Sequence, residues 1–523
     1  METGSDVLFS NLPRHENRIF TNRNIKLARI QSIGFDMDYT LAEYRQEALD
    51  KLTMELALAH LINKYNYPEE IQNIPYEDGF TIRGLVMDTQ LGNVLKIDKF
   101  RYVSLAYHGL KPLDHDHRAK IYNSAARISF RSERYRSVDT LFEILETYLF
   151  AALIDHFEVK KGEKVDYKKL YTELRDSIDC CHADGSMKEK IMAEPEKYIM
   201  DDPLLIPTLH MFKEKGKQLF VLTNSEVEYT EFVLDFLFRN SEPFFEGWRD
   251  CFDIVGAAAC KPKFFNDGTK LEILEEKNNL FFSGGNLEFL ENRLEGRGDQ
   301  VLYVGDHIYG DILKSKLSSA WRTCLIVPEL DFQIKAESQT MPHLKELRTN
   351  EARRKQIAME LNWRRNQIAD LYQFKEAEAD ELERSHLELL DERLCYLNRQ
   401  VEAHHKELSR ILYESKVLRR KISSSFNRYW GRLFKTGGQA SAFAEQIRDY
   451  ACIYTSKVSN FSYFNFQTYL QSVVAPMPHE DSLYSVHDIN FDVSIETDSI
   501  DEPDITGKAD VLDLEQMGVS GGL

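Results

Sequence analysis

The sequence predicts an α/β fold with a parallel sheet, a large insertion, and a long helical segment toward the C-terminus. Short apolar runs alternate with amphipathic helical patterns between residues 31 and 328, which is typical of a parallel sheet covered by helices on both faces. The polar ends of the first two runs, Asp36 and Thr223, are 187 positions apart, far more than a sheet crossover needs. From 387 to 422, apolar residues follow three-four spacing, which indicates a coiled coil.

The strands of the predicted sheet are the apolar runs themselves, each followed by polar residues. We expect these strands at 31–36, 218–223, 252–260, 300–304 and 322–328. We expect helices at 48–66, 139–157 and 203–216, and strands of the insertion between 80 and 108. Ligands of such sheets bind beyond the carboxyl ends of the strands, so the polar residues after these runs should share one working edge.

These patterns divide the chain into six predicted segments. They are an N-terminal arm with the first core strand (1–45), an inserted cap (46–200), the rest of the core (201–341), a helical hairpin or coiled coil (342–435), helices packing on the core (436–479) and a tail (480–523). The tail has twelve acidic residues against Lys508 alone. This composition is typical of a disordered terminus, and an acidic interaction tail is the alternative.

The coiled-coil pattern predicts an apolar seam that something must cover. Its positions are Leu387, Leu390, Leu394, Leu397, Val401, His404, Leu408, Ile411, Ser415, Leu418 and Ile422. The partner is either the preceding helix, around 357–374, or another subunit. Because that helix is about half as long as the seam, we expect a hairpin whose uncovered part packs on another subunit or on the core.

Composition excludes several classes of protein. A net charge of −19 argues against a general nucleic-acid binder, which needs a basic face. No apolar run approaches the roughly 18 residues that span a bilayer, and the first residues lack the pattern of a secretory signal. Seven Cys without metal-like spacing indicate reduced thiols. The sequence therefore predicts a cytoplasmic protein with neither a nucleic acid nor a membrane as partner.

Four groups of polar residues follow the predicted strands. They are Asp36-Met-Asp38-Tyr-Thr40, Thr223-Asn224-Ser225, Lys261-Pro262 and Gly305-Asp306-His-Ile-Tyr-Gly-Asp311. Singly, each has a plainer explanation: Asp38 could cap a turn, Thr223 could begin a loop, and Lys261 could be a surface lysine. Together and in this order, they resemble the haloacid dehalogenase superfamily of phosphohydrolases. The resemblance implies a Rossmann-like haloacid dehalogenase core whose insertion is a cap over the active site.

The resemblance also implies a role for each residue in a Mg²⁺-dependent reaction. Asp36 would be the nucleophile that forms an aspartyl phosphate, and Asp38 the general acid and base. Mg²⁺ prefers oxygen ligands, which the carboxylates of Asp36 and Asp306 and the backbone carbonyl of Asp38 would supply. Asp311 would orient a metal-bound water or Lys261. The groups that hold the phosphoryl oxygens would be Thr223, Asn224 and Lys261, with Ser225 among the substrate-binding residues.

Flanking residues narrow the resemblance to the cytosolic purine 5′-nucleotidases that prefer IMP and GMP. The matching stretches are 33–42, 261–265, 303–316 and 321–323. In that family an Arg and an Asp on one cap helix bind a 6-oxopurine, and here Arg175 and Asp179 share one helical face. Arg would donate to O6 and N7, and Asp would accept from N1–H, which adenine lacks. Phe142 could stack on the base, and His182 and Lys188 complete the family pattern. The alternative is that Arg175 and Asp179 form a surface ion pair and that Phe142 is a core residue.

The sequence departs from the animal members of this family, which ATP-like effectors activate at a site between subunits. Asp139 stands where an Asn is expected, Leu317 where a Lys is, and Asp449 where an Arg is. Gln446 and Tyr450 are retained. Two positive charges are thus lost and two negative charges gained where a triphosphate would bind. We therefore expect no nucleotide activation through these residues.

The sequence as a whole predicts a Mg²⁺-dependent 5′-nucleotidase that hydrolyses IMP and GMP through an aspartyl phosphate. The same intermediate could pass its phosphoryl group to a nucleoside. The expected partners are purine nucleoside monophosphates and further copies of the chain, as a dimer or tetramer. The alternatives are a phosphatase for another phosphorylated metabolite and an interaction scaffold with a relict site.

Overall fold

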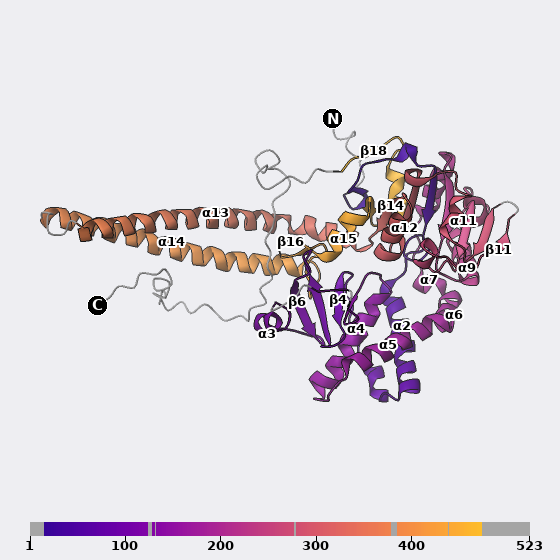
Figure 1. Cartoon of the computed structure of the whole chain (residues 1–523), viewed down its shortest axis with the longest axis horizontal. Helices are drawn as coiled ribbons and strands as arrows, with labels where there is room; N and C mark the ends of the chain where they lie inside the picture. The colour runs from indigo at the N-terminus through magenta and orange to yellow at the C-terminus, as the bar shows by residue number, and fades with distance from the viewer. Residues whose placement is uncertain are drawn as a thin grey trace, which may run out of the picture.

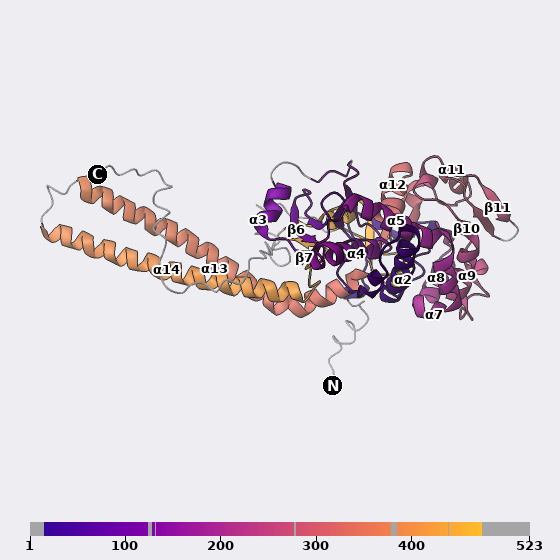
Figure 2. The same cartoon turned by 90° about the horizontal axis from the view of Figure 1, so that it is seen from below.

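The computed structural model describes residues 15–123, 128–130, 132–276, 279–377, 384–437 and 439–472. They form a core around a nine-stranded sheet, a cap beside it, and a two-helix hairpin that extends away from both (Figures 1 and 2). The tail expected at 480–523 lies outside the described residues. Within these ranges no helix has the length and apolar character needed to cross a bilayer.

The central sheet confirms the predicted α/β class. Its order is β1-β17-β14-β13-β3-β9-β10-β12-β11, with seven inner parallel strands and an antiparallel strand at each edge. The predicted strands are present as β3 (Ser32–Phe35), β9 (Gln218–Leu222), β10 (Ile254–Ala257), β13 (Val301–Gly305) and β14 (Arg322–Ile326). The others are β1 (Phe20–Thr21), β11 (Glu272–Glu275), β12 (Leu280–Ser283) and β17 (Ile453–Thr455).

Both faces of this sheet are buried, as alternate residues of β9 show. Leu219 and Val221 pack in one apolar cluster with α8 (Leu205–Glu214) and α9 (Val227–Phe238). Phe220 and Leu222 pack on the opposite face with α11 (Leu287–Glu291). Gly34 of β3 makes room for this packing, because a Cβ there would lie 2.1 Å from the ring of Phe220. The sheet is thus fixed from both sides, and its carboxyl edge is held in place.

The C-terminal part of the core corrects the sequence prediction. Helices were expected over 436–479, but the described part contains α15 (Ala442–Tyr450) followed by β17, which pairs with β14 in the central sheet. The three residues of β17 are too few to show a recognisable strand alternation in the sequence. They become a strand because β14 would otherwise leave its backbone hydrogen-bonding groups unpaired. Short pairs complete this region: β15 (Lys435–Thr436) with β16 (Gln439–Ala440), and β18 (Tyr469–Leu470) with β2 (Ile25–Lys26).

The cap combines an antiparallel sheet with a group of helices. The sheet order is β7-β6-β5-β4-β8, made of β4 (Leu85–Asp88), β5 (Asn93–Ile97), β6 (Val103–His108), β7 (Lys111–Pro112) and β8 (Tyr135–Ser137). The helices are α2 (Gln46–Tyr65), α3 (His115–Arg118), α4 (Glu143–Ile154), α5 (Tyr167–Ala183), α6 (Ser186–Ala193) and α7 (Pro195–Tyr198). Helices α2, α4 and α5 share one apolar cluster with β4 and β5. The predicted helix over 48–66 and the strands between 80 and 108 are confirmed.

Two chain segments join the cap to the core, and they lie side by side. Tyr44 and Ile199 form an antiparallel bridge. The Arg45 N–H donates to the Tyr198 carbonyl at 2.7 Å, and the Met200 N–H donates to the Glu43 carbonyl at 2.7 Å. The cap is therefore attached a few residues behind the polar end of β3.

The hairpin consists of α13 (Glu329–Ala377) and α14 (Arg384–Ser424), which run antiparallel and side by side (Figures 1 and 2). The expectation that the partner helix covers only 357–374 was wrong, because α13 has 49 residues and continues through Pro342. An interior Pro costs a helix about 3 kcal/mol. Packing offsets this cost: Leu344 and Leu347 of α13 are buried in a cluster with Leu418 and Ile422 of α14.

Helix α13 covers the seam of α14 along its full length. All eleven seam positions are buried or half-buried. The polar break at His404 is satisfied inside the hairpin, since its Nε2 lies 2.7 Å from Glu360 Oε2 and its Nδ1 lies 2.6 Å from the Gln400 carbonyl. The bidentate pair between Arg353 and Glu407, at 2.8 and 2.9 Å, adds a cross-link. The seam therefore does not need a second subunit or the core to cover it, contrary to the expectation.

Lys96 of β5 predicts a pH dependence of stability. Its buried Nζ donates to the carbonyls of Trp430 and Arg432, each at 2.5 Å, and burial followed by the charge of Arg432 lowers its pKa to about 7. The unfolded chain binds this proton near the ordinary pKa of 10.5, so the free energy of unfolding falls as pH drops from about 10.5 to about 7. Lys96→Met should flatten this dependence in urea unfolding between about pH 7 and about pH 10. Equal slopes for variant and wild type would contradict the assignment.

Candidate active site

The four groups of polar residues predicted to share one edge meet at the carboxyl ends of β3, β9, β10 and β13. These strands are neighbours in the sheet, in the order β13-β3-β9-β10. Asp36 follows β3 directly, and its N–H donates to the Val304 carbonyl of β13 at 2.8 Å. Thr223 follows β9, and its N–H donates to the Gly256 carbonyl of β10 at 2.9 Å. The ladder hydrogen bonds of the sheet thus continue into the site and fix its backbone.

Three carboxylates and one ammonium form the centre of this site. One carboxylate oxygen from each of Asp36, Asp306 and Asp311 lies within 4.8 Å of the others, an arrangement that could hold a metal ion. The Lys261 Nζ lies 2.9 Å from Asp36 Oδ1 and 2.7 Å from Asp311 Oδ1. All four side chains are almost completely buried. One cation for three buried anions leaves a net negative charge of the kind that a divalent cation would balance.

Electrostatics and hydrogen bonding both fit a cation at this centre. Burial and then Asp311 raise the pKa of Asp36 well above its usual range, although Lys261 acts in the opposite direction. The same two causes raise the pKa of Asp306 to about 8. The buried Asp306 Oδ2 has no hydrogen-bond partner among the described residues. Since Mg²⁺ binds carboxylate oxygens, the residues present fit the ion that the sequence analysis expected.

Two hydroxyl groups hold Asp38, one from Tyr44 and one from Ser225. The Tyr44 hydroxyl donates to Asp38 Oδ1 and the Ser225 hydroxyl to Asp38 Oδ2, both at 2.6 Å. Burial raises the pKa of Asp38, while the two hydrogen bonds act against this shift. A carboxyl group with a raised pKa, fixed at both oxygens, is suited to carry and return a proton. Ser225 was predicted to bind substrate, and its hydroxyl contacts Asp38 in this structure.

Thr223 and Asn224 brace the site backbone. The buried Thr223 hydroxyl accepts from the Ser225 N–H at 3.1 Å. Asn224 uses both ends of its amide on the backbone of Lys261: Oδ1 accepts from the Lys261 N–H at 2.5 Å, and Nδ2 donates to the Lys261 carbonyl at 3.0 Å. These two hydrogen bonds join the loop after β9 to the loop after β10, and they fix the backbone position of Lys261.

Asp311 reaches the centre because of a glycine at the end of β13. It lies in the π-helical turn η8 (Ile308–Leu313), which follows Asp306. A Cβ on Gly305 would lie 2.6 Å from the Asp311 Cβ and 2.5 Å from its Oδ2, too close for any other residue. The His307 N–H donates to Asp311 Oδ2 at 3.2 Å, which leaves Oδ1 for Lys261.

Tyr303 was not predicted as a site residue. Its hydroxyl accepts from the Lys261 Nζ at 3.0 Å and donates to the Leu222 carbonyl at 3.0 Å. Tyr303 is a strand residue of β13, and a Tyr in a buried strand looks like a core residue in the sequence. Tyr44 was missed for a similar reason, since nothing in the sequence distinguishes its hydroxyl from that of any other Tyr.

Three of the predicted base-binding residues lie beside the loops that follow β3 and β9. The Phe142 ring centroid is 4.7 Å from that of Tyr39 and 5.8 Å from that of His182. Lys188 of α6 donates to Glu226 Oε2 at 2.9 Å, which links the cap to the loop after β9. Burial lowers the pKa of His182, so this ring is neutral near pH 7. Phe142 thus contacts the loop after β3, His182 packs against Phe142, and Lys188 contacts the loop after β9.

Arg175 and Asp179 are paired with each other. Arg175 Nε lies 3.0 Å from Asp179 Oδ2, and Nη2 lies 3.0 Å from Asp179 Oδ1. Arg175 Nη1 also donates to the buried Glu146 at 2.6 Å, a contact that the sequence did not predict. The Arg175 and Asp179 side chains remain 43% and 56% exposed, so both can be reached from solvent.

The residues that depart from the family pattern of effector binding carry other contacts. Asp139 accepts from the Ser137 hydroxyl at 2.6 Å, Leu317 is 72% exposed, and the Asp449 carbonyl accepts from Arg23 at 2.5 Å. Lys316 donates to the Tyr450 carbonyl at 2.9 Å. Arg23 and Lys316 are therefore cationic groups beside Asp449 and Tyr450.

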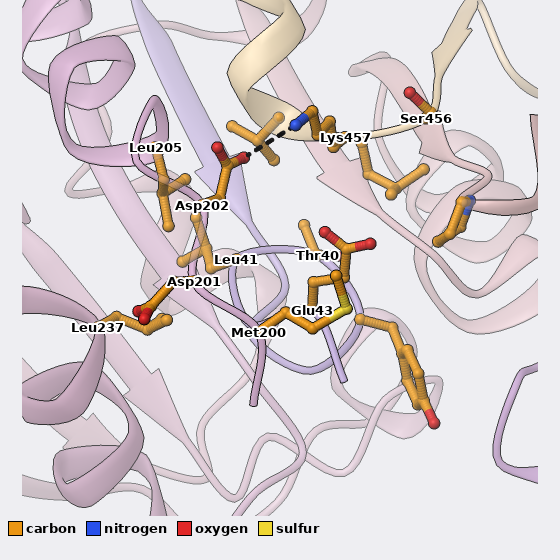
Figure 3. Close-up of a pocket in the computed structure, with 14 residues that line it drawn as sticks. Thr40, Leu41, Glu43, Met200, Asp201, Asp202, Leu205, Leu237, Ser456 and Lys457 are labelled. Carbon is orange, nitrogen blue, oxygen red and sulfur yellow. Dashed lines mark ion pairs between the residues drawn. The ribbon is translucent and has the colours of Figure 1, made fainter. Parts of the chain in front are cut away.

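A pocket lies beside the loop that follows β3, where the linkers between cap and core pack against residues 456–458 (Figure 3). Glu43, Asp202 and Lys457 are among its polar lining residues, and Lys457 Nζ lies 3.8 Å from Asp202. Burial raises the pKa of Glu43, although Lys457 acts against this shift. The lining does not include Asp36, Asp38 or Lys261, so the pocket is separate from the carboxylate centre.

Comparisons with known proteins agree with this geometry. Residues 19–482 match the model of the 5′ nucleotidase family. The 5′-nucleotidase domain-containing protein 2 of Rattus norvegicus is 33% identical over 340 residues, which cover 61% of this chain and 60% of the rat protein. The 5′-nucleotidase domain-containing protein DDB_G0275467 of Dictyostelium discoideum is 26% identical over 479 residues, covering 88% of this chain and 74% of that protein. The alignment thus spans less than two thirds of the rat relative.

Among solved structures, the HAD-hydrolase YfnB from Bacillus subtilis, bound to magnesium, is 16% identical. It covers 58% of this chain and 90% of its own, with a TM-score of 0.22, a likeness too low to carry an argument about function. The family match is much broader. It extends over most of the sequence and includes each of the four strand ends that meet around Asp36. The chain therefore belongs to the 5′ nucleotidase family.

Proposed function

We propose that this chain is a Mg²⁺-dependent 5′-nucleotidase that hydrolyses purine nucleoside 5′-monophosphates, chiefly IMP and GMP, through an aspartyl phosphate. The observation that carries the proposal is the position of the Lys261 ammonium between Asp36 and Asp311, at 2.9 and 2.7 Å, beside Asp306. The ion would be held by the carboxylates of Asp36 and Asp306 and the backbone carbonyl of Asp38, with Asp311 beside them. Bound Mg²⁺ would supply the positive charge that lets a phosphate dianion approach these carboxylates.

In the first step Asp36 attacks the phosphorus in line with the leaving 5′-oxygen. Both donors on Asp36, the Met37 N–H at 2.8 Å and Lys261, approach Oδ1, so Oδ2 is available for the attack. The new bond joins Oδ2 to phosphorus, and the bond from phosphorus to the 5′-oxygen breaks. Asp38, protonated at the start, gives its proton to that oxygen, and the nucleoside leaves neutral. Lys261 stabilises the charge that develops on the phosphoryl oxygens, with Thr223 and Asn224 fixing the surrounding loops.

In the second step a water molecule attacks the phosphorus of the aspartyl phosphate. Asp38, now ionised, takes a proton from that water, and the bond between phosphorus and Asp36 breaks to release inorganic phosphate. A nucleoside hydroxyl in place of the water would receive the phosphoryl group, so the same site can act as a nucleoside phosphotransferase. Tyr44 and Ser225 keep Asp38 in one orientation for both proton transfers.

A phosphate-release screen tests this proposal directly. The purified full chain is incubated with IMP, GMP, AMP, pyrimidine nucleotides and sugar phosphates, each with Mg²⁺ or with EDTA. We expect release from IMP and GMP with Mg²⁺ and none with EDTA. Release from a sugar phosphate alone would make the chain a phosphatase for another metabolite. Release from no compound would favour an interaction scaffold with a relict site.

The base preference rests on Arg175 and Asp179, and it gives a prediction of its own. Asp179→Asn should reduce kcat/KM on IMP and GMP about tenfold or more, because a charged hydrogen bond to the purine N1–H is worth about 1.5–3 kcal/mol. AMP should lose far less, since an Asn amide can donate to the adenine N1. Equal losses on all three nucleotides would mean that Asp179 only orients Arg175 and the cap.

A cytoplasmic location and a homo-oligomer remain part of the proposal. All seven cysteines are free thiols, which agrees with a reducing compartment. The outer faces of the hairpin expose large apolar side chains, which would be available to a second copy: Met359, Trp363, Leu389, Tyr396 and Tyr413. Light scattering of the full chain measures whether a dimer or tetramer forms.

A further inference from the structure

Arg83 is a buried cation that no motif of the sequence singled out. It lies just before β4, in the cap, and is only 1% exposed. The next residue, Gly84, has φ +82°, and a Cβ there would lie 2.5 Å from the Cβ of Phe443 in α15. The turn can therefore press against α15 only with a glycine at this position. This close approach carries the Arg83 side chain from the cap into the core.

The Arg83 guanidinium contacts two other parts of the chain. Nε and Nη2 donate to the two carboxylate oxygens of Glu329 at 2.8 and 2.5 Å. Nη1 donates to the backbone carbonyl of Asp306 at 3.0 Å. Glu329 is the first residue of α13, and Asp306 follows β13. Cap, core and hairpin thus meet at one side chain.

These contacts account for a charge that would otherwise be unfavourable in the interior. Burial opposes the charge of Arg83, but Glu329, Asp306 and Asp139 act in the other direction and together raise the pKa of the guanidinium. Only Arg has a planar group that can pair with a carboxylate through two nitrogens and still donate to a carbonyl through the third. A Lys at this position could not make all three hydrogen bonds.

The contact with the Asp306 backbone matters because one oxygen of the Asp306 side chain has no hydrogen bond among the described residues. Its buried Oδ2 has no hydrogen-bond partner in the described part of the chain, so side-chain hydrogen bonds do not fix this oxygen. The direction of the carboxylate then depends on where the backbone of Asp306 lies. Arg83 holds that backbone through its carbonyl oxygen, from the side of the cap.

We propose that Arg83 is a positioning residue for Asp306, held in place by Glu329, and that it sets the affinity of the carboxylate centre for Mg²⁺. The inference rests on the proposed Mg²⁺-dependent function. Arg83 itself touches neither the ion nor the substrate. Removing a partner that orients a metal ligand typically weakens metal affinity about 10- to 100-fold.

The test separates positioning from stability. Arg83→Met combined with Glu329→Met removes both charges together, since a buried ion pair can often be replaced by apolar residues without loss of stability. Mg²⁺ binding to the full chain is measured by titration calorimetry, and the melting temperature is measured without the ion. The matched control is Arg353→Met with Glu407→Met, which removes another bidentate pair of α13 far along the hairpin. Asp306→Asn shows how the signal changes when a ligand itself is lost.

We expect the Arg83/Glu329 double variant to bind Mg²⁺ about tenfold more weakly than wild type, and the control pair to bind it as wild type does. Arg83→Lys, which keeps the charge, should also bind Mg²⁺ more weakly. Unchanged Mg²⁺ affinity in both variants would overturn the inference while leaving the proposed function standing. A wild-type chain that binds no Mg²⁺ would overturn the proposed function and the inference with it. If the double variant does not fold, the affinity of Arg83→Lys decides alone.

Discussion

Asp36→Asn is expected to eliminate turnover while the fold is kept. An amide cannot form the acyl phosphate, and loss of a catalytic nucleophile lowers kcat by about 10⁴-fold or more. The fold should persist because an Asn oxygen can still accept from the Met37 N–H, and Lys261 keeps its contact with Asp311. The measurement is kcat on the best nucleotide of the screen, with circular dichroism to verify folding.

The same variant has a defined control. Cys260→Ser changes an exposed residue next to Lys261 without touching the carboxylates, and it should keep wild-type activity. Activity of more than a few per cent in purified Asp36→Asn would exclude Asp36 as the nucleophile. The phosphoryl acceptor would then have to be another residue or water itself.

Asp38→Asn has the second largest expected effect, and the effect should depend on the leaving group. A nucleoside 5′-oxygen needs a proton to leave, so kcat on a nucleotide should fall about 10²- to 10⁴-fold without the general acid. An aryl phosphate releases a phenolate that is stable without a proton. In single-turnover measurements, the rate at which an aryl phosphate forms the aspartyl phosphate should therefore fall much less than the rate for a nucleotide.

Tyr44→Phe provides the comparison for this prediction. It removes one hydrogen bond to Asp38 but leaves the carboxyl group, so it should reduce activity on a nucleotide far less than Asp38→Asn does. If Asp38→Asn slows formation of the aspartyl phosphate equally for aryl and nucleoside substrates, Asp38 serves the structure of the site and not proton transfer.

The sequence was sufficient to predict which residues meet at the site, and the reason is physical. Parallel strands place their carboxyl ends at one edge, so Asp36, Thr223, Lys261 and Asp306 had to converge if their apolar runs were neighbouring strands. The structure has them at this edge. The seam of α14 was also predictable, because helical periodicity is a local property of the chain. What covers that seam was not predictable, since the continuation of α13 through Pro342 depends on packing against α14.

The contacts that orient the site residues depended on the tertiary structure. Asn224 was predicted to bind phosphoryl oxygens, and nothing in the sequence indicated that its amide also clamps the backbone of Lys261, 37 positions away. Arg175 was predicted, together with Asp179, from the family resemblance, but its contact with Glu146 comes from a different helix. Neither contact leaves a periodic or composition signal, because a hydrogen bond between distant segments needs only one suitable residue at each end.

The sequence by itself determined the class of sheet, the order of the polar strand ends and the helical periodicity of the hairpin, because each follows from spacing along the chain. Only the tertiary structure decided that β17 completes the sheet, that Tyr44 and Ser225 hold Asp38, and that Arg83 reaches Asp306 from a turn of the cap 223 positions earlier. Such pairings form only when segments that are distant in the sequence pack against one another. Their free energy depends on desolvation and on partners that are adjacent only in the folded chain.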